Sequence, residues 1–147
     1  MTTRRLFLVC AAAPLAGCAT TPSTAVQTNL IQPQGIKQFR RVFIEALPED
    51  EFQVVSALVV ELADMGFEVM GTAFQAPVDS DLLVKVVAVG GWDLKRYLQS
   101  LQLQFVAAKS GTIVATTSFY SNGVWLGVRD NRLKLVFNDL RAKQGSF

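Results

Sequence analysis

Alternation of apolar and polar side chains limits the middle of this chain to a β-hairpin. The two kinds of residue alternate from Leu101 to Phe105 in a run that continues to Ala107, and a second strand-forming run extends from Thr112 to Tyr120. Residues 108–111, Ala-Lys-Ser-Gly, are typical of the turn that joins two antiparallel strands. This hairpin is the clearest indication of β structure in the chain, and it predicts that the fold is built on a sheet.

Two stretches with a helical repeat of apolar residues accompany the hairpin. Residues 49–65 form the first, with acidic residues at the helix start and Gly66 as the terminating residue. The second begins after Asp130 or Asn131, either of which can cap a helix. The apolar stripes consist of Phe52, Val55, Leu58, Val59 and Leu62 in the first helix, and of Leu133, Val136, Phe137 and Leu140 in the second.

Three further segments, 40–47, 67–74 and 82–89, have the composition of strands. The most apolar is 82–89, which we expect to be a central strand buried on both faces. Residues 92–100 fit either a helix or a loop that leads into a strand. The predicted fold is α+β, a two-layer sandwich with a mostly antiparallel sheet of about four to five strands and two helices on one face.

The amino terminus has the layout of a secretory signal. Two positive charges, Arg4 and Arg5, precede the uncharged apolar run 6–13. A membrane span needs about 20 apolar residues, so this run is too short to cross a bilayer. The sequence Leu15-Ala16-Gly17-Cys18 then ends in a cysteine whose thiolate is a nucleophile.

This motif resembles the lipobox of bacterial lipoprotein precursors. The resemblance implies a diacylglyceryl group on the sulfur of Cys18, cleavage before Cys18, and attachment to membrane lipid through the acyl chains. Since Ala19 follows the cysteine, it also implies the periplasmic face of the outer membrane, or the outer face of the plasma membrane in a Gram-positive host. The alternative is an ordinary signal peptide with a chance cysteine.

These patterns divide the chain into three parts. Residues 1–17 are the predicted lipoprotein signal peptide. Residues 18–36, rich in Thr, Pro, Ser and Gln and without charge, are a predicted flexible tether. Residues 37–147 are long enough to form a single α+β domain with a sizeable core.

Composition excludes several classes of function. The chain has 14 Lys plus Arg and 12 Asp plus Glu, and loss of Arg4 and Arg5 with the signal leaves 12 of each. A neutral domain lacks the positive charge that nucleic-acid binding needs. The sequence has no histidine, and its cysteines are Cys10 and Cys18, so the mature domain has neither a disulfide nor a catalytic triad. We therefore expect no metal, no cofactor and no enzymatic activity.

A few side chains stand out as candidate contacts. Trp125, between Val124 and Leu126 in a short apolar connector, is either an exposed partner patch or part of the core. Trp92 could contact a partner, but packing on the core is the favoured interpretation. Asp79 and Asp81 could form a carboxylate pair, although a solvated turn explains them better.

From Phe39 onward, the order of elements resembles that of small periplasmic domains such as the amino-terminal domain of TolB and the LptE-type lipoproteins. The segments Gly91-Trp92-Asp93 and Tyr97-Leu98, followed by an alternating strand, carry this resemblance. It implies assembly or scaffolding at the cell envelope. The leading hypothesis is therefore a non-enzymatic accessory or assembly subunit that binds another envelope protein. The alternatives are a binding module for a glycan or small apolar ligand, and then a hydrolase built on carboxylates.

Overall fold

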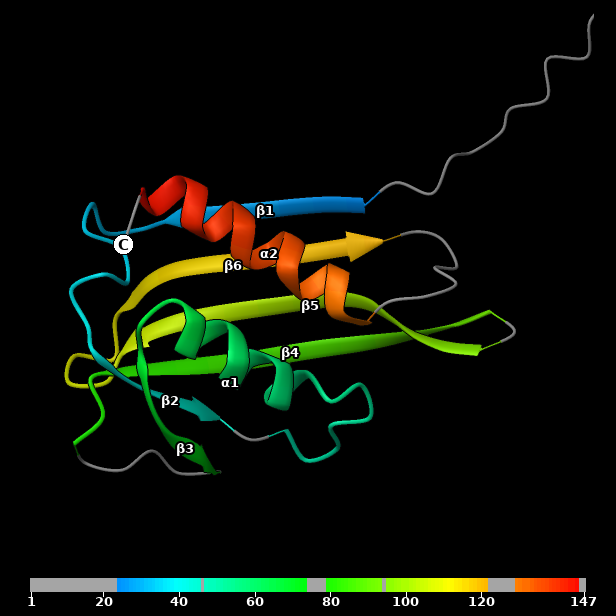
Figure 1. Ribbon diagram of the computed structural model, residues 1–147, viewed down its shortest axis with the longest axis horizontal. Coiled ribbons are helices and arrows are strands. Elements are labelled where there is room, and N and C mark those ends of the chain that lie inside the picture. The colour runs from blue at the N-terminus through cyan, green and yellow to red at the C-terminus, as the bar shows by residue number, and fades with distance from the viewer. Residues whose placement is uncertain (1–23, 46, 74–78, 94, 122–128, 146–147) are drawn as a thin grey trace, which may run out of the picture.

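The computed structural model describes residues 24–45, 47–73, 79–93, 95–121 and 129–145, although not the side chains of 93, 95 and 129–131. Within these ranges, six strands and two helices pack in two layers (Figure 1). Their bounds are β1 (Thr24–Leu30), β2 (Arg41–Glu45), α1 (Val54–Asp64), β3 (Glu68–Ala73), β4 (Leu82–Asp93), β5 (Lys95–Ala107), β6 (Ile113–Ser121) and α2 (Arg129–Gln144).

The sheet has the strand order β1-β6-β5-β4-β2-β3 and is mixed. Neighbours from β1 to β4 are antiparallel, whereas β2 runs parallel to both β3 and β4. The predicted fold class, a mostly antiparallel sheet of four to five strands, is therefore wrong. The parallel part arises because α1 connects β2 to β3, and a crossover helix returns the chain in the same direction.

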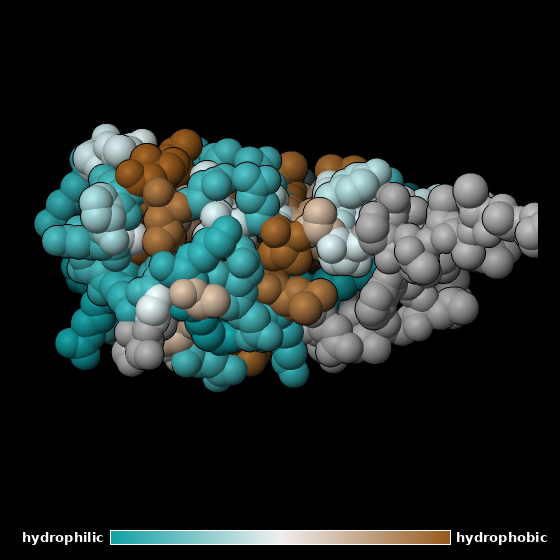
Figure 2. All heavy atoms as spheres, turned by 90° about the horizontal axis from the view of Figure 1, so that it is seen from above, coloured by the Kyte–Doolittle hydropathy of each residue, from teal (hydrophilic) through white to brown (hydrophobic). Residues whose placement is uncertain are grey.

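The additional strand is β1, which lies in the predicted tether. It pairs with β6 along its whole length, and the buried hydroxyls of Thr28 and Thr117 lie 2.8 Å apart. Ile36 is also fully buried, so the prediction of a flexible tether is wrong for residues 24–36. An edge strand obtains its hydrogen bonds from one neighbour and needs apolar residues on one face only. Figure 2 looks onto the side of the molecule where β1 lies, and shows hydrophilic side chains there with hydrophobic ones between them.

Both helices lie on the same face of the sheet (Figure 1). Leu58 and Leu62 of α1 are fully buried, as are Phe137 and Leu140 of α2. They pack in one core with the sheet residues Val42, Ile44, Leu82, Val84, Leu101, Leu103, Phe105, Ala115 and Phe119. The apolar stripe predicted for α2 is thus confirmed as its inner face. The stripe predicted for α1 is confirmed at Leu58 and Leu62, whereas Val55 and Val59 are half-buried. Phe52 lies before the helix, which begins at Val54 and not at residue 49.

Polar contacts fix the ends and the relative position of the helices. The Asp50 carboxylate accepts hydrogen bonds from the backbone N–H groups of Val54 and Val55, at 2.6 and 3.0 Å, so an acidic residue caps α1. Gly66 has φ +86°, the left-handed conformation that ends many helices. Arg141 of α2 pairs with the largely buried Glu61 of α1 at 2.9 Å, and this pair joins the two helices.

Candidate functional site

The face of the sheet opposite the helices is the candidate site. Both helices occupy the other face (Figure 1), so among the described residues no helix covers β1, β6, β5 and β4 on this side. Side chains alternate between the two faces of a strand. The core residues of these strands point toward the helices, and the residues between them form the open face.

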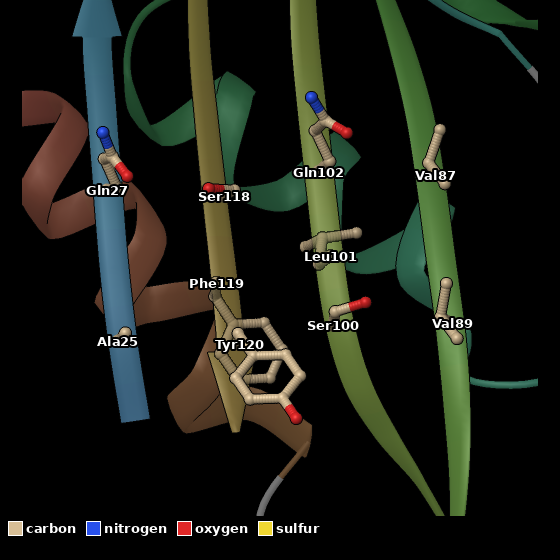
Figure 3. A pocket seen from close by; sticks show the side chains of 10 residues that line it. All are labelled: Ala25, Gln27, Val87, Val89, Ser100, Leu101, Gln102, Ser118, Phe119 and Tyr120. Carbon is tan, nitrogen blue, oxygen red and sulfur yellow. The ribbon is translucent and has the colours of Figure 1, made fainter. Parts of the chain in front are cut away.

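The register places the open-face side chains in rows across four strands. One row consists of Ala25, Tyr120, Ser100 and Val89, and the next consists of Gln27, Ser118, Gln102 and Val87. Together they line a shallow hollow of about 370 Å³, to which Leu101 and Phe119 also contribute (Figure 3). The hollow therefore comes from residues far apart in the sequence that the sheet brings together.

The hollow is uncharged and partly apolar. Val87, Val89 and Tyr120 are 51%, 48% and 50% exposed, which is high for such large apolar side chains. The other described lining residues supply amides from Gln27 and Gln102 and hydroxyls from Ser100 and Ser118, and none of the described lining residues is acidic or basic. Chemically, such a surface offers apolar contact, aromatic packing and neutral hydrogen bonds.

Next to the hollow, the open face carries a charged side chain. Lys85 lies two residues before Val87 on β4, and its ammonium group is 3.9 Å from the Glu45 carboxylate. This pair is about half exposed on both sides, so it contributes little to stability. It marks one boundary of the uncharged region.

The sequence predicted a different surface. Trp92, which we expected in the core, is 74% exposed. The reason is that β4 and β5 project past both helices (Figure 1), so no helix covers the sheet there. Cys18 and the predicted patch of Val124, Trp125 and Leu126 lie outside the described residues.

The sequence did not predict the hollow, because residues 82–89 were expected to form a strand that is buried on both faces. Val87 and Val89 instead face outward on a strand that is buried on one side only. The signal was in the neighbouring hairpin, where Gln102, Gln104 and Ser118 put polar side chains on that same face. Because β4 lies beside this hairpin in the sheet, the side chains of β4 on the same face are exposed as well.

The two candidate aspartates serve the fold. Arg41 donates from its Nε and Nη2 atoms to the Asp81 carboxylate at 3.2 and 3.0 Å, and its backbone N–H donates to the same group. Asp79 lies 3.7 Å from the Arg41 guanidinium. These bonds connect the start of β2 to the start of β4. The described residues contain no group of three or more His, Cys, Asp or Glu side chains that could hold a metal.

Acid should weaken the Arg41–Asp81 connection. Hydrogen bonds from Arg41 hold the pKa of Asp81 below its ordinary value of 3.8. The stabilisation is therefore complete above pH 3.8 and disappears as the pH falls through the lower pKa of the folded state. We expect Asp81→Asn to lower the free energy of unfolding at neutral pH, and the difference from wild type to shrink with acid in urea titrations. Asp79→Asn is the matched control with a small effect, and a difference for Asp81→Asn that does not change with pH would contradict this assignment.

No helix in the described part of the chain is long and apolar enough to span a membrane. Neither a family model nor a curated protein matches the sequence. Comparison with solved structures does find proteins of similar fold. The fold is similar to that of PelC. The PelC dodecamer from Paraburkholderia phytofirmans, in space group P6, has a TM-score of 0.58 and 9% identity, and the match covers 81% of this chain and 97% of PelC.

A second crystal form of PelC gives the same result. A dodecamer with one leucine replaced by methionine, in space group C2, has a TM-score of 0.54 and 7% identity over 83% of this chain and 97% of PelC. At such identities the similarity to PelC shows a shared fold alone. The predicted resemblance to TolB and to LptE-type lipoproteins stays a prediction.

Proposed function

We propose that this chain is a non-enzymatic envelope lipoprotein that works as a subunit of an assembly of its own copies. Acylated Cys18 would hold it on the periplasmic face of the outer membrane, or on the outer face of the plasma membrane in a Gram-positive host. The lipobox-like sequence at residues 15–18 supports the anchor. The open face of the sheet would supply the contact between copies.

The observation that carries this proposal is the exposure of Val87, Val89 and Tyr120 in one uncharged hollow. The cores of protein interfaces are poor in charged residues and rich in aromatic ones. Covering these three side chains removes apolar area from water, and no charge in the hollow has to lose its hydration. A second protein surface can therefore bind there at low electrostatic cost.

The similarity to PelC supports a second copy as the partner. Both PelC structures are dodecamers, and the match extends over 97% of the PelC chain. A fold that assembles in that protein has a shape that allows many copies to pack together. Self-association also explains how a small domain could expose this surface without a permanent second protein.

Val87→Lys should break the assembly. The substitution puts an ammonium group on the lining of the hollow, and loss of an interface anchor typically costs more than about 1.4 kcal/mol, or a tenfold weaker association. Val60, which is 58% exposed on α1 on the other side of the sheet, provides the matched control Val60→Lys. Light scattering of the lipidated chain in mild detergent measures the number of copies. We expect several copies for wild type and Val60→Lys, and fewer for Val87→Lys.

Two results of that experiment would contradict the proposal. If wild type has the mass of one chain, the protein does not self-associate through any surface. If Val87→Lys has the same mass as wild type, the open face is not the contact. The first result would favour a second candidate, a glycan-binding module. Gln27, Gln102 and the hydroxyls beside the Tyr120 ring offer neutral hydrogen bonds and an aromatic stacking surface, so binding of neutral oligosaccharides would then be measured.

A further inference from the structure

The proposed anchor determines which end of the sheet faces the membrane. Cys18 is six residues before Thr24, the first residue of β1. Six residues of fully extended chain span at most about 20 Å. If Cys18 is acylated, as the proposed function holds, the end of the sheet where β1 begins lies within about 20 Å of the lipid.

The register shows what else lies at that end. Ala25 is level with Tyr120, Ser100 and Val89 across four strands. Beyond Val89 the ladder between β4 and β5 continues from Gly90 to Asp93, in the direction away from the rest of the sheet. Four more residues add about 13 Å of strand. Figure 1 shows this hairpin extending past both helices, on the side from which the chain enters β1.

The projecting hairpin carries Trp92, the most exposed large apolar side chain among the described residues, at 74%. Two polar contacts join the hairpin to the rest of the fold. Arg96 pairs with Glu51 at 2.7 Å, and Arg132 of α2 donates a hydrogen bond to the Leu98 carbonyl. The buried Arg132 guanidinium also lies 5.7 Å from the centres of the Tyr97 and Phe119 rings.

We propose that the projecting β4–β5 hairpin makes a second membrane contact at Trp92, with the indole in the headgroup region of the bilayer that holds Cys18. Tryptophan is enriched at membrane interfaces because its ring is apolar and its N–H can hydrogen-bond. The tether keeps the hairpin close to the lipid, so a weak contact is populated at a high effective concentration. The contact would hold the strands end-on to the membrane and leave the open face of the sheet accessible from the side.

Quenching by brominated lipid tests this contact. The chain has two tryptophans, so Trp125→Phe leaves Trp92 as the single tryptophan, whose emission is excited selectively at wavelengths that tyrosine does not absorb. The lipidated full chain is reconstituted in phosphatidylethanolamine–phosphatidylglycerol vesicles, with and without bromine on the acyl chains near the headgroups. We expect loss of most of the Trp92 emission in the brominated vesicles, together with a blue shift relative to the protein in detergent.

The matched control places a tryptophan at the other end of the sheet. Ile31 follows the last residue of β1 and is 55% exposed, and Ile31→Trp combined with Trp92→Phe and Trp125→Phe should keep its emission. Vesicle-bound protein with an unquenched Trp92 would overturn the membrane contact, leave the anchor intact and assign Trp92 to a protein partner. Equal quenching of both positions would overturn the orientation. A wild-type chain that does not float with vesicles would overturn the anchor and the hairpin contact together.

Discussion

Leu62→Asp unfolds the domain. Leu62 lies on the inner face of α1, fully buried between the helix and the sheet. An aspartate there either keeps an unpaired charge away from water or takes up a proton at a cost in free energy, and in both cases the loss is several kcal/mol. Whole domains are stable by only about 5–15 kcal/mol. Thermal unfolding followed by circular dichroism should show no cooperative transition, or one far below that of wild type.

Val60→Asp is the matched control for this prediction. Val60 is two residues earlier on the same helix and faces solvent, so the same substitution should change the free energy of unfolding by no more than about 0.5 kcal/mol. The pair of variants separates burial from the helix propensity of aspartate. A Leu62→Asp protein that melts like wild type would mean that α1 does not cover the sheet.

We expect Cys18→Ser to abolish the proposed lipid attachment. The reacting group of a lipoprotein precursor is a thiolate, and a serine hydroxyl is not ionised at neutral pH. Each buried CH₂ of an acyl chain contributes about 0.8 kcal/mol to membrane binding, so losing two chains removes the anchor completely. We expect no incorporation of radioactive palmitate, and either a soluble protein or an uncleaved precursor.

Cys10→Ser is the control for the lipid assignment, since Cys10 is the one other cysteine of the chain. It lies in the predicted signal peptide, eight residues before Cys18, and its replacement should leave palmitate labelling unchanged. Labelling that survives Cys18→Ser would show that the lipobox assignment is wrong. Labelling lost in both variants would indicate a failure of export, not of acylation.

Secondary structure was predicted well where the sequence has a regular pattern of apolar residues. The hairpin of β5 and β6 and the two helices combine strong alternation or a clear stripe with a turn or a cap. In these segments local propensity and burial favour the same structure, which is why pattern reasoning succeeds. Gly66 also ends α1 as the sequence indicated, whereas α1 begins at Val54, five residues later than predicted, with Asp50 accepting hydrogen bonds from its first N–H groups.

The errors have a common physical origin, which is that partners distant in the sequence determine strand pairing and exposure. Strand β1 is polar by composition and becomes ordered because β6 offers it a ladder of hydrogen bonds. Val87 has the apolar neighbours of a buried residue, yet its own side faces solvent. Trp92 is exposed because the hairpin is longer than the helices that cover the sheet. The pairing of β1 and the exposure of Val87 and Trp92 therefore cannot be predicted from the residues of each segment alone.

Native mass spectrometry tests at once whether this chain is lipid-anchored and whether it assembles with its own copies. The wild-type protein is extracted from bacterial membranes in mild detergent and measured without denaturation. We expect complexes of several identical subunits, each with the mass of residues 18–147 plus a diacylglyceryl group. Single copies that keep residues 1–17 and carry no lipid would contradict this expectation.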